Sequence, residues 1–215
     1  KREVDMSKLL YIQASPRGER SHSLAAADGF VESYKKANPE DEVVTINLFE
    51  KPLPPFDGDV LDAKYAILYG LEHTPAQRDA WKQVEAVIEE FKSADKYVFA
   101  VAMWNFSLPY ALKHYIDIIV QPTYTFSFSP EEGYRGLAGG KPVFIAYARG
   151  GEYPPGTDAE AFDFQTKYLE HELGFIGFTD IWTVVVEPTL AGGPETAAGK
   201  RAAAISSASE AAGRF

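Results

Sequence analysis

Cysteine is absent from the 215-residue sequence, and its absence excludes disulfides, thiolate nucleophiles and cysteine-bound zinc. Basic residues are the minority, with 21 Lys and Arg against 31 Asp and Glu and a formal net charge of −10. Nucleic acids and anionic membrane surfaces attract proteins through a basic surface. We therefore expect neither a nucleic acid nor a membrane among the partners of this chain.

Long hydrophobic runs are also missing. No stretch reaches the roughly 18 consecutive apolar residues of a candidate membrane-spanning helix. The N-terminal segment KREVDMSKLLYIQAS lacks the long apolar region and the small-residue cleavage site of a secretory signal. The sequence therefore predicts a soluble cytoplasmic protein.

Common catalytic motifs do not occur either. The four histidines are scattered and form no H-E-x-x-H pair, so no metal site is predicted. There is no G-x-S-x-G elbow of a serine hydrolase, and neither the G-x-G-x-x-G nor the G-x-x-x-x-G-K-[ST] phosphate loop is present. With so few acid–base candidates, demanding chemistry would have to come from a bound cofactor.

What the sequence does contain is an alternation of strands and helices. Apolar or β-branched runs, typical of strands in a parallel sheet, occur at 8–15, 42–48, 96–103, 141–148 and 180–187. Apolar spacing and cap residues predict helices over 22–37, 59–70, 75–93, 107–120 and 158–173 and in the alanine-rich tail from Glu195. We expect Ser107 to cap the 107–120 helix and residues 123–129 to form a short hairpin or extended excursion.

This alternation predicts an α/β fold, a doubly wound parallel sheet with helices on both faces. Five strands suit the flavodoxin-like order 2-1-3-4-5, whereas a full dinucleotide-binding fold has six or more. We expect a single domain over residues 1–215, with residues 1–6 as a disordered extension. Ligands of such folds bind at the carboxyl ends of the strands, so the loops after the first, third and fourth strands should carry the site.

The loop after the first strand, SPRGERSHS (15–23), offers hydroxyl groups at Ser15, Ser21 and Ser23 beside a helix N-terminus. Unpaired backbone N–H groups and the helix dipole favour an anion there, and serine hydroxyls can donate to phosphate oxygens. Ser21 could equally be an ordinary helix cap. The residues alone are compatible with a phosphate site and with simple capping.

The loop after the third strand is unusually apolar. Met103, Trp104 and Phe106 surround Asn105, and this combination suits a flat heteroaromatic ring that needs both stacking and edge hydrogen bonds. The alternative is a loop packed beneath a neighbouring helix. After the fourth strand, the glycines at 150–151 would let backbone approach a ligand closely, or would simply form a turn.

Read together, the three loops resemble the FMN-dependent NADH-azoreductase family of flavodoxin-like NAD(P)H:quinone oxidoreductases. The matching segments are SPRGERSHS, MWNFSLPYALKHYID, TFSFSPEEGYRGLAGGKPV, ARGGEY and ELGFIGFTD, in order between about residues 8 and 187. Each segment is weak alone, and their ordered combination is specific. The resemblance implies FMN as cofactor, NADH or NADPH as electron donor and a quinone or azo compound as substrate of a homodimer.

The resemblance also assigns cofactor contacts. Ser15, Ser21, His22 and Ser23 fall where the family holds the FMN phosphate, with Arg17 as a charged neighbour. Residues 103–106 would contact the isoalloxazine ring, and Arg149, Gly150 and Gly151 would lie at its pyrimidine edge, where Ala148 replaces the usual serine and leaves only main-chain contacts. The aromatic residues expected to contact substrate are Tyr124, Phe126 and Tyr153.

The implied reaction is a two-electron transfer with a ping-pong mechanism, in which NAD(P)H reduces the flavin and leaves before the acceptor enters the same space. No catalytic side chain is implied, because flavin N5 carries the chemistry. Three alternatives stay open: a flavodoxin-like electron carrier, an acyl carrier protein phosphodiesterase and a flavin-free structural relative, for which Ala148 is the indication. Missing metal ligands and the missing nucleophile elbow argue against the phosphodiesterase.

Overall fold

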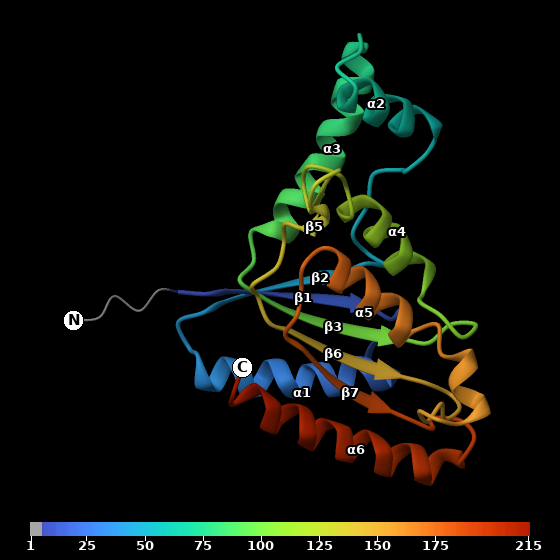
Figure 1. Cartoon of the computed structure of the whole chain (residues 1–215). Coiled ribbons are helices and arrows are strands. Elements are labelled where there is room, and N and C mark those ends of the chain that lie inside the picture. The colour runs from blue at the N-terminus through green and yellow to red at the C-terminus, as the bar shows by residue number, and fades with distance from the viewer. Residues whose placement is uncertain (1–5) are drawn as a thin grey trace.

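The strands form one five-stranded parallel sheet in the computed structural model, which describes residues 6–215 (Figure 1). They are β1 Lys8–Ala14, β2 Glu42–Asn47, β3 Lys96–Ala102, β6 Val143–Ala148 and β7 Ile181–Val186. The order across the sheet is β2-β1-β3-β6-β7. This confirms the predicted order 2-1-3-4-5, because β6 and β7 are the fourth and fifth strands of this sheet. Apart from Met6, the expected N-terminal extension lies outside the described residues.

Helices cover both faces of the sheet (Figure 1). On one face Phe30 stacks on Phe144 of β6 with ring centroids 4.1 Å apart, and Leu9 and Tyr11 of β1 join the same apolar cluster. Leu10, next along β1, points to the cluster on the other face. Both faces of the central strands are therefore buried. The covering helices are α1 His22–Ala37 and α6 Gly193–Ala212 on one face, and α3 Pro75–Lys92, α4 Tyr110–Ile119 and α5 Thr166–Phe175 on the other.

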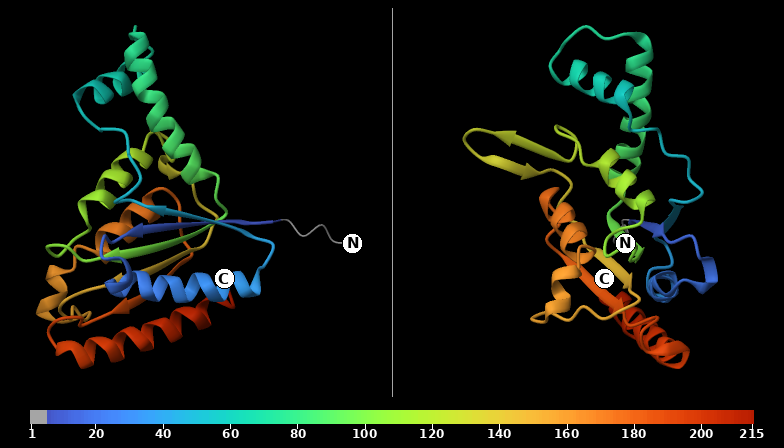
Figure 2. Two further views of the ribbon diagram at one scale, coloured as in Figure 1. Left: turned by 180° about the vertical axis from the view of Figure 1, so that it is seen from behind. Right: turned by 90° about the vertical axis from the view of Figure 1, so that its right-hand side faces the viewer.

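Two segments extend away from the sheet. α2 Gly58–Leu68 packs against α3, and both project beyond the sheet at the top of Figure 1. β4 Phe126–Ser129 and β5 Gly133–Gly136 form an antiparallel hairpin that projects sideways in the right-hand view of Figure 2. Large apolar side chains are exposed on or beside these projections, namely Tyr65, Leu68, Tyr69, Leu71, Phe128 and Tyr134.

Local sequence explains where the long helices begin. The Ser21 hydroxyl accepts a hydrogen bond from the N–H of Leu24 and caps α1. Thr74 and Gln77 form a reciprocal capping box at the start of α3, which has a proline in its first turn. Both starts agree with the predicted boundaries.

The predicted cap of the 107–120 helix is wrong. α4 begins at Tyr110 after Pro109, and no side chain caps it. Ser107 instead exchanges two backbone hydrogen bonds with Trp104, each 3.0 Å long. The chain turns tightly between these two residues, and the N-cap position falls at Pro109, two residues beyond Ser107, so the Ser107 hydroxyl is not placed to cap the helix.

The predicted helix over 158–173 is divided. A 3-10 helix, η2, spans Asp158–Phe162, and α5 begins only at Thr166. Between them Asp163 accepts hydrogen bonds from the backbone N–H groups of Gln165 and Thr166. Aspartate competes in this way for backbone donors, which interrupts the helix. The hairpin is displaced as well, since β4 covers only the second half of 123–129 and its partner strand lies further along the chain.

Two further features concern only residues 6–215. No helix in this part of the chain is both long and apolar enough to cross a membrane. The same residues contain no group of three or more histidine, aspartate or glutamate side chains arranged to hold a metal ion.

Candidate functional site

The carboxyl ends of β1, β3 and β6 meet at a cavity of about 120 Å³. Because these strands are neighbours in a parallel sheet, the loops that follow them are neighbours too. Larger hollows adjoin the cavity, one of about 330 Å³ that shares Ser15 and one of about 420 Å³ that shares His22. The predicted cofactor contacts that line the cavity are Ser15, Arg17, Ser21, His22, Met103, Trp104, Ala148 and Gly150.

The first loop combines capping with unsatisfied polar atoms. Ser21 caps α1, and its hydroxyl lies 3.2 Å from that of Ser23. Ser15 Oγ and His22 Nδ1 are buried and have no hydrogen-bond partner among the described residues. A buried polar atom without a partner is costly, and ligand oxygens would satisfy both atoms. Ser21 is thus a cap, as one interpretation held, while Ser15 and His22 remain available for an anion.

The electrostatics of this loop also favour an anion. Burial lowers the pKa of His22, and the positive charges of Arg201 and Arg17 lower it further. Arg201 is held beside the loop by a 3.0 Å hydrogen bond from Nη2 to the carbonyl of Glu19. The amino end of α1 adds the positive pole of the helix dipole. This corner of an acidic protein is therefore locally positive.

The second loop is a strained turn. Trp104 and Ser107 pair across it, and the two residues between them have positive φ, 47° at Asn105 and 68° at Phe106. Such turns normally carry Asn-Gly, because glycine has no Cβ to clash. Asparagine tolerates this region, but a bulky phenylalanine is strained there. Strain of this kind is typical of functional sites, and Phe106 is 47% exposed.

Trp104 both borders the cavity and packs against neighbouring side chains. It lines the cavity. Its ring also packs against Phe49 and Tyr110, with centroids 5.7 and 6.1 Å away. One side of the indole is therefore fixed by neighbours while the residue stays partly exposed at the cavity.

In the third loop the arginine side chain is buried and bonded to other side chains of the protein, so only main-chain atoms face a ligand. The Arg149 side chain is 4% exposed and donates to Asp163 at 3.0 Å, Gln165 at 3.0 Å and Glu187 at 3.3 Å. The carbonyl of Gly150 accepts from the N–H of Leu190 at 3.0 Å. The guanidinium is therefore occupied by these partners, and main-chain atoms are what this turn can offer a ligand.

The partners of Arg149 connect the strand ends around the cavity. Gln165 donates to the carbonyl of Val101 at the end of β3, and Glu187 directly follows β7. Burial alone would raise the pKa of Asp163, but hydrogen bonds from Thr166 and the charge of Arg149 lower it below its ordinary value. Asp163 is thus ionised at neutral pH and holds the guanidinium in place.

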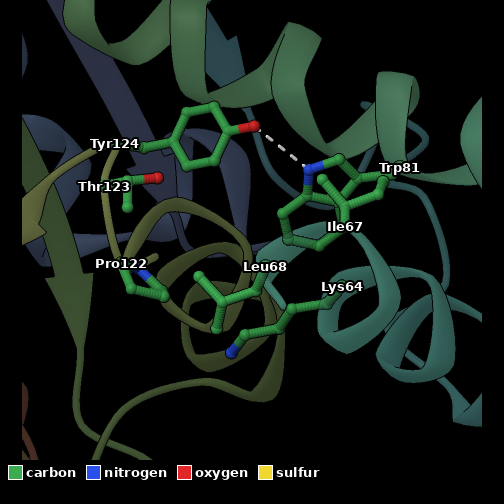
Figure 3. A pocket seen from close by; sticks show the side chains of 7 residues that line it. All are labelled: Lys64, Ile67, Leu68, Trp81, Pro122, Thr123 and Tyr124. Carbon is green, nitrogen blue, oxygen red and sulfur yellow. Dashed lines mark hydrogen bonds between the residues drawn. The ribbon is translucent and has the colours of Figure 1, made fainter. Parts of the chain in front are cut away.

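The remaining predicted residues do not line this cavity. Phe106 and Tyr153 meet edge to face at 6.3 Å on the neighbouring loops. Phe126 lies on the hairpin. The Tyr124 hydroxyl accepts a hydrogen bond from Trp81 (Figure 3) and donates one to Glu85, both on α3, and Tyr124 is not among the residues that line the cavity. Asn105, Arg149, Gly151 and Ser23 also lie outside the lining.

Sequence reasoning missed part of the lining. Thr189 and Leu190, which follow β7, border the cavity, and Asn47 and Phe49, at the end of β2, border the hollow that shares Ser15. The rule that ligands bind at the carboxyl ends of strands could have found them, had it been applied to all five strands.

The chain is similar to known proteins over nearly all its length. A family model described as flavodoxin-like fold matches residues 7–211. An FMN-dependent NADH:quinone oxidoreductase of Nitratidesulfovibrio vulgaris (strain DP4) is 58% identical over 203 residues, which are 94% of this chain and 97% of that protein. A crystal structure of azoreductase from Bacillus anthracis str. Sterne has a TM-score of 0.89 at 32% identity and covers 98% of this chain and 100% of its own. An FMN-dependent NADH-azoreductase from Bacillus anthracis str. Ames Ancestor in complex with FMN has a TM-score of 0.87 at 29% identity, covering 97% and 99%.

Proposed function

Because this chain belongs to the flavodoxin-like family of FMN-dependent NADH:quinone oxidoreductases and azoreductases, we propose that it transfers two electrons from NADH through FMN to quinones and azo compounds. The observation that carries this proposal is the cavity at the sheet edge, where Ser15 Oγ and His22 Nδ1 lie buried beside a helix N-terminus with no hydrogen-bond partner within residues 6–215. Bound FMN would supply the redox chemistry that no side chain of the site can provide.

The residues of the three loops would hold and orient the cofactor. Ser15, His22 and the first N–H groups of α1 would bind its phosphate, and the arginine charges nearby would favour the phosphate dianion. Met103 and Trp104 would contact the ring system, and the main-chain N–H groups at 150–151 would hydrogen-bond its pyrimidine edge. Loss of the family serine at Ala148 removes a hydroxyl from that edge and leaves the backbone contacts intact.

Donor and acceptor would use one space in turn. Phe106 is exposed and packs edge to face on Tyr153 of the neighbouring loop, and this aromatic pair would offer a surface on which a flat ring could lie. We infer a ping-pong mechanism because a nicotinamide and an acceptor cannot both occupy that space. NADPH remains a second donor candidate. Use of a reduced nicotinamide nucleotide also leads us to propose a cytoplasmic location.

We further propose a homodimer. Exposed aromatic and aliphatic side chains lie on α2, on the connection from α2 to α3 and on the hairpin, and exposed apolar patches commonly mark interfaces. Phe126 and Tyr124 do not reach the cavity of their own chain. A substrate contact from Phe126 therefore requires a second copy of the chain.

Flavin titration and turnover test this function. Purified protein should bind FMN with one site per chain, and NADH should reduce a quinone and an azo dye with parallel double-reciprocal lines. Ser15→Ala should weaken FMN binding, whereas the control Ser127→Ala on the hairpin should not. Protein that binds no FMN would refute the proposal.

The same assays separate the alternatives. An electron carrier would bind FMN but show no steady NADH turnover with quinones. A phosphodiesterase would release phosphopantetheine from acyl carrier protein in the absence of flavin.

A further inference from the structure

Glu187 lies directly after β7 and bonds to two parts of the third loop at once. Its Oε2 accepts a hydrogen bond from Arg149 Nη1 at 3.3 Å and another from the backbone N–H of Tyr153, also at 3.3 Å. The side chain is only 22% exposed, so water competes with these bonds in part. Glu187 therefore connects the residue at the start of the turn after β6 to the backbone at its far end.

The main-chain carbonyls of this turn are already used inside the protein. The carbonyl of Arg149 accepts from both the N–H and the hydroxyl of Thr189, each at 2.9 Å, and that of Gly150 accepts from the N–H of Leu190 at 3.0 Å. The N–H groups of Gly150 and Gly151 have no acceptor within residues 6–215. What the turn offers a ligand is therefore a pair of hydrogen-bond donors.

Tyr153 packs back onto the turn. A Cβ at Gly151 would lie 3.4 Å from the hydroxyl oxygen of Tyr153. The guanidinium carbon of Arg149 lies 5.7 Å from the centre of the same ring, a cation–π distance. Arg149 and Tyr153 thus contact each other, and Glu187 bonds to both. A displacement of the Glu187 carboxylate would therefore displace the glycine N–H groups that lie between them.

The other partners of Arg149 hold it from a different side. Asp163 and Gln165 belong to the segment that leads into α5, and they bond to the guanidinium at 3.0 Å each. Within residues 6–215 neither of them contacts the backbone of residues 150–153. Asp163 and Gln165 therefore fix the arginine side chain, whereas Glu187 fixes both the arginine and the main chain of the turn.

We propose that Glu187 is a positioning residue for the cofactor, which keeps the N–H groups of Gly150 and Gly151 in place at the edge of the cavity by bonding Arg149 and Tyr153. This inference rests on the proposed function, in which those N–H groups meet the pyrimidine edge of FMN. A hydride brings two electrons and one proton, so the reduced ring carries one negative charge until a second proton arrives. Donors that are already fixed stabilise such a charge without reorganisation.

Two variants separate the position of the carboxylate from its charge. Glu187→Asp keeps the charge but is one methylene shorter, and because both bonds are already 3.3 Å long, it cannot hold both donors. Glu187→Gln keeps the length and an acceptor oxygen but removes the charge. The measurement is the midpoint potential of FMN bound to each protein, from spectroscopic titration in equilibrium with a reference dye.

Glu187→Asp should lower the midpoint potential, because the loosened N–H groups stabilise reduced FMN less. Losing one charge-assisted hydrogen bond should weaken the reduced complex by roughly tenfold relative to the oxidised one, which is about 30 mV for a two-electron couple. Glu187→Gln should not lower the potential, since its amide oxygen still accepts and the loss of a nearby negative charge favours the reduced form. In the FMN-free protein, hydrogen exchange at the Tyr153 amide should be faster in Glu187→Asp than in wild type.

Asp163→Asn is the matched control. It loosens Arg149 from the α5 side and leaves the bond between Glu187 and Tyr153 in place. This variant should lower the free energy of unfolding without lowering the midpoint potential.

Three results would overturn this inference. The first is an unchanged or raised potential in Glu187→Asp. The second is an equal drop in Glu187→Asp and Glu187→Gln, which would assign the effect to charge. The third is a drop in Asp163→Asn as large as that in Glu187→Asp, which would assign it to the general stability of the turn. All three are read on protein that binds FMN, whereas wild type that binds no FMN would refute the proposed function and this inference with it.

Discussion

Replacing Arg149 with methionine should destabilise this protein about as much as truncating a large core side chain. Methionine keeps much of the aliphatic length of arginine, so packing changes little while the guanidinium disappears. The structure shows what remains behind. Asp163, with a side chain 8% exposed, and Glu187, 22% exposed, both lose their cationic partner, and Gln165 loses a donor.

The size of the effect follows from burial. Removing one partner of a buried ion pair typically costs about 3–5 kcal/mol, because the other charge stays buried without compensation. Most of that cost should come from Asp163, because Glu187 is more exposed and water can partly solvate its charge. Arg149→Met should therefore lower the free energy of unfolding by about 3–5 kcal/mol. In the double variant Arg149→Met with Asp163→Asn, the loss should be smaller than the sum of the two single losses, because the buried charge is gone.

Urea denaturation of the FMN-free protein measures this directly, since bound cofactor would add its own stabilisation. Arg149→Lys serves as a control that keeps the charge and loses the forked geometry. An Arg149→Met protein within about 1 kcal/mol of wild type would refute the reasoning, as would strict additivity in the double variant.

The remaining predictions concern the loops and pH. Ser15→Ala should leave the unfolding free energy of the FMN-free protein within about 0.5 kcal/mol of wild type, because the Ser15 hydroxyl has no hydrogen-bond partner within residues 6–215. Ser21→Ala should lower it by about 1 kcal/mol through the lost helix cap, and urea denaturation of both variants measures the difference. Phe106→Gly should lower the free energy of unfolding by less than about 1 kcal/mol, because glycine adopts the positive φ without strain and this offsets the lost packing. NADH turnover should nevertheless fall. A loss near the roughly 3–5 kcal/mol typical of a buried phenylalanine would contradict this prediction. The depressed pKa of Asp163 adds stability that is fully present above its unfolded pKa of about 3.9 and is lost as pH falls through the lower folded pKa. Asp163→Asn should therefore flatten the dependence of the unfolding free energy on pH below about pH 4.

Much of the fold follows from local patterns. Apolar or β-branched strand runs alternating with helical spacing predict the doubly wound sheet, and the observed order agrees. Ser21 and Thr74 mark helix starts correctly, because a cap depends only on residues within one turn. The carboxyl-edge rule also brings together most of the cavity lining, from Ser15 to Gly150.

Local patterns fail where a residue's role depends on distant partners. Ser107 has the chemistry of a cap, yet the turn that pairs it with Trp104 moves the helix start to Tyr110, with Pro109 at the N-cap position. Arg149 resembles a ligand contact in sequence, but Asp163 and Glu187 approach it only after α5 and β7 have packed.

The sequence alone determined the order of elements, the family and the three loops at the sheet edge, because each depends on short-range spacing or on contiguous motifs. Tertiary structure decided which side chains those loops leave free for a ligand. Among the described residues it left Ser15 Oγ and His22 Nδ1 without hydrogen-bond partners, and it enclosed the Arg149 guanidinium and placed Tyr124 beside Trp81. Contacts between residues far apart in the chain form only when helices and strands dock, and no local pattern encodes which partner arrives.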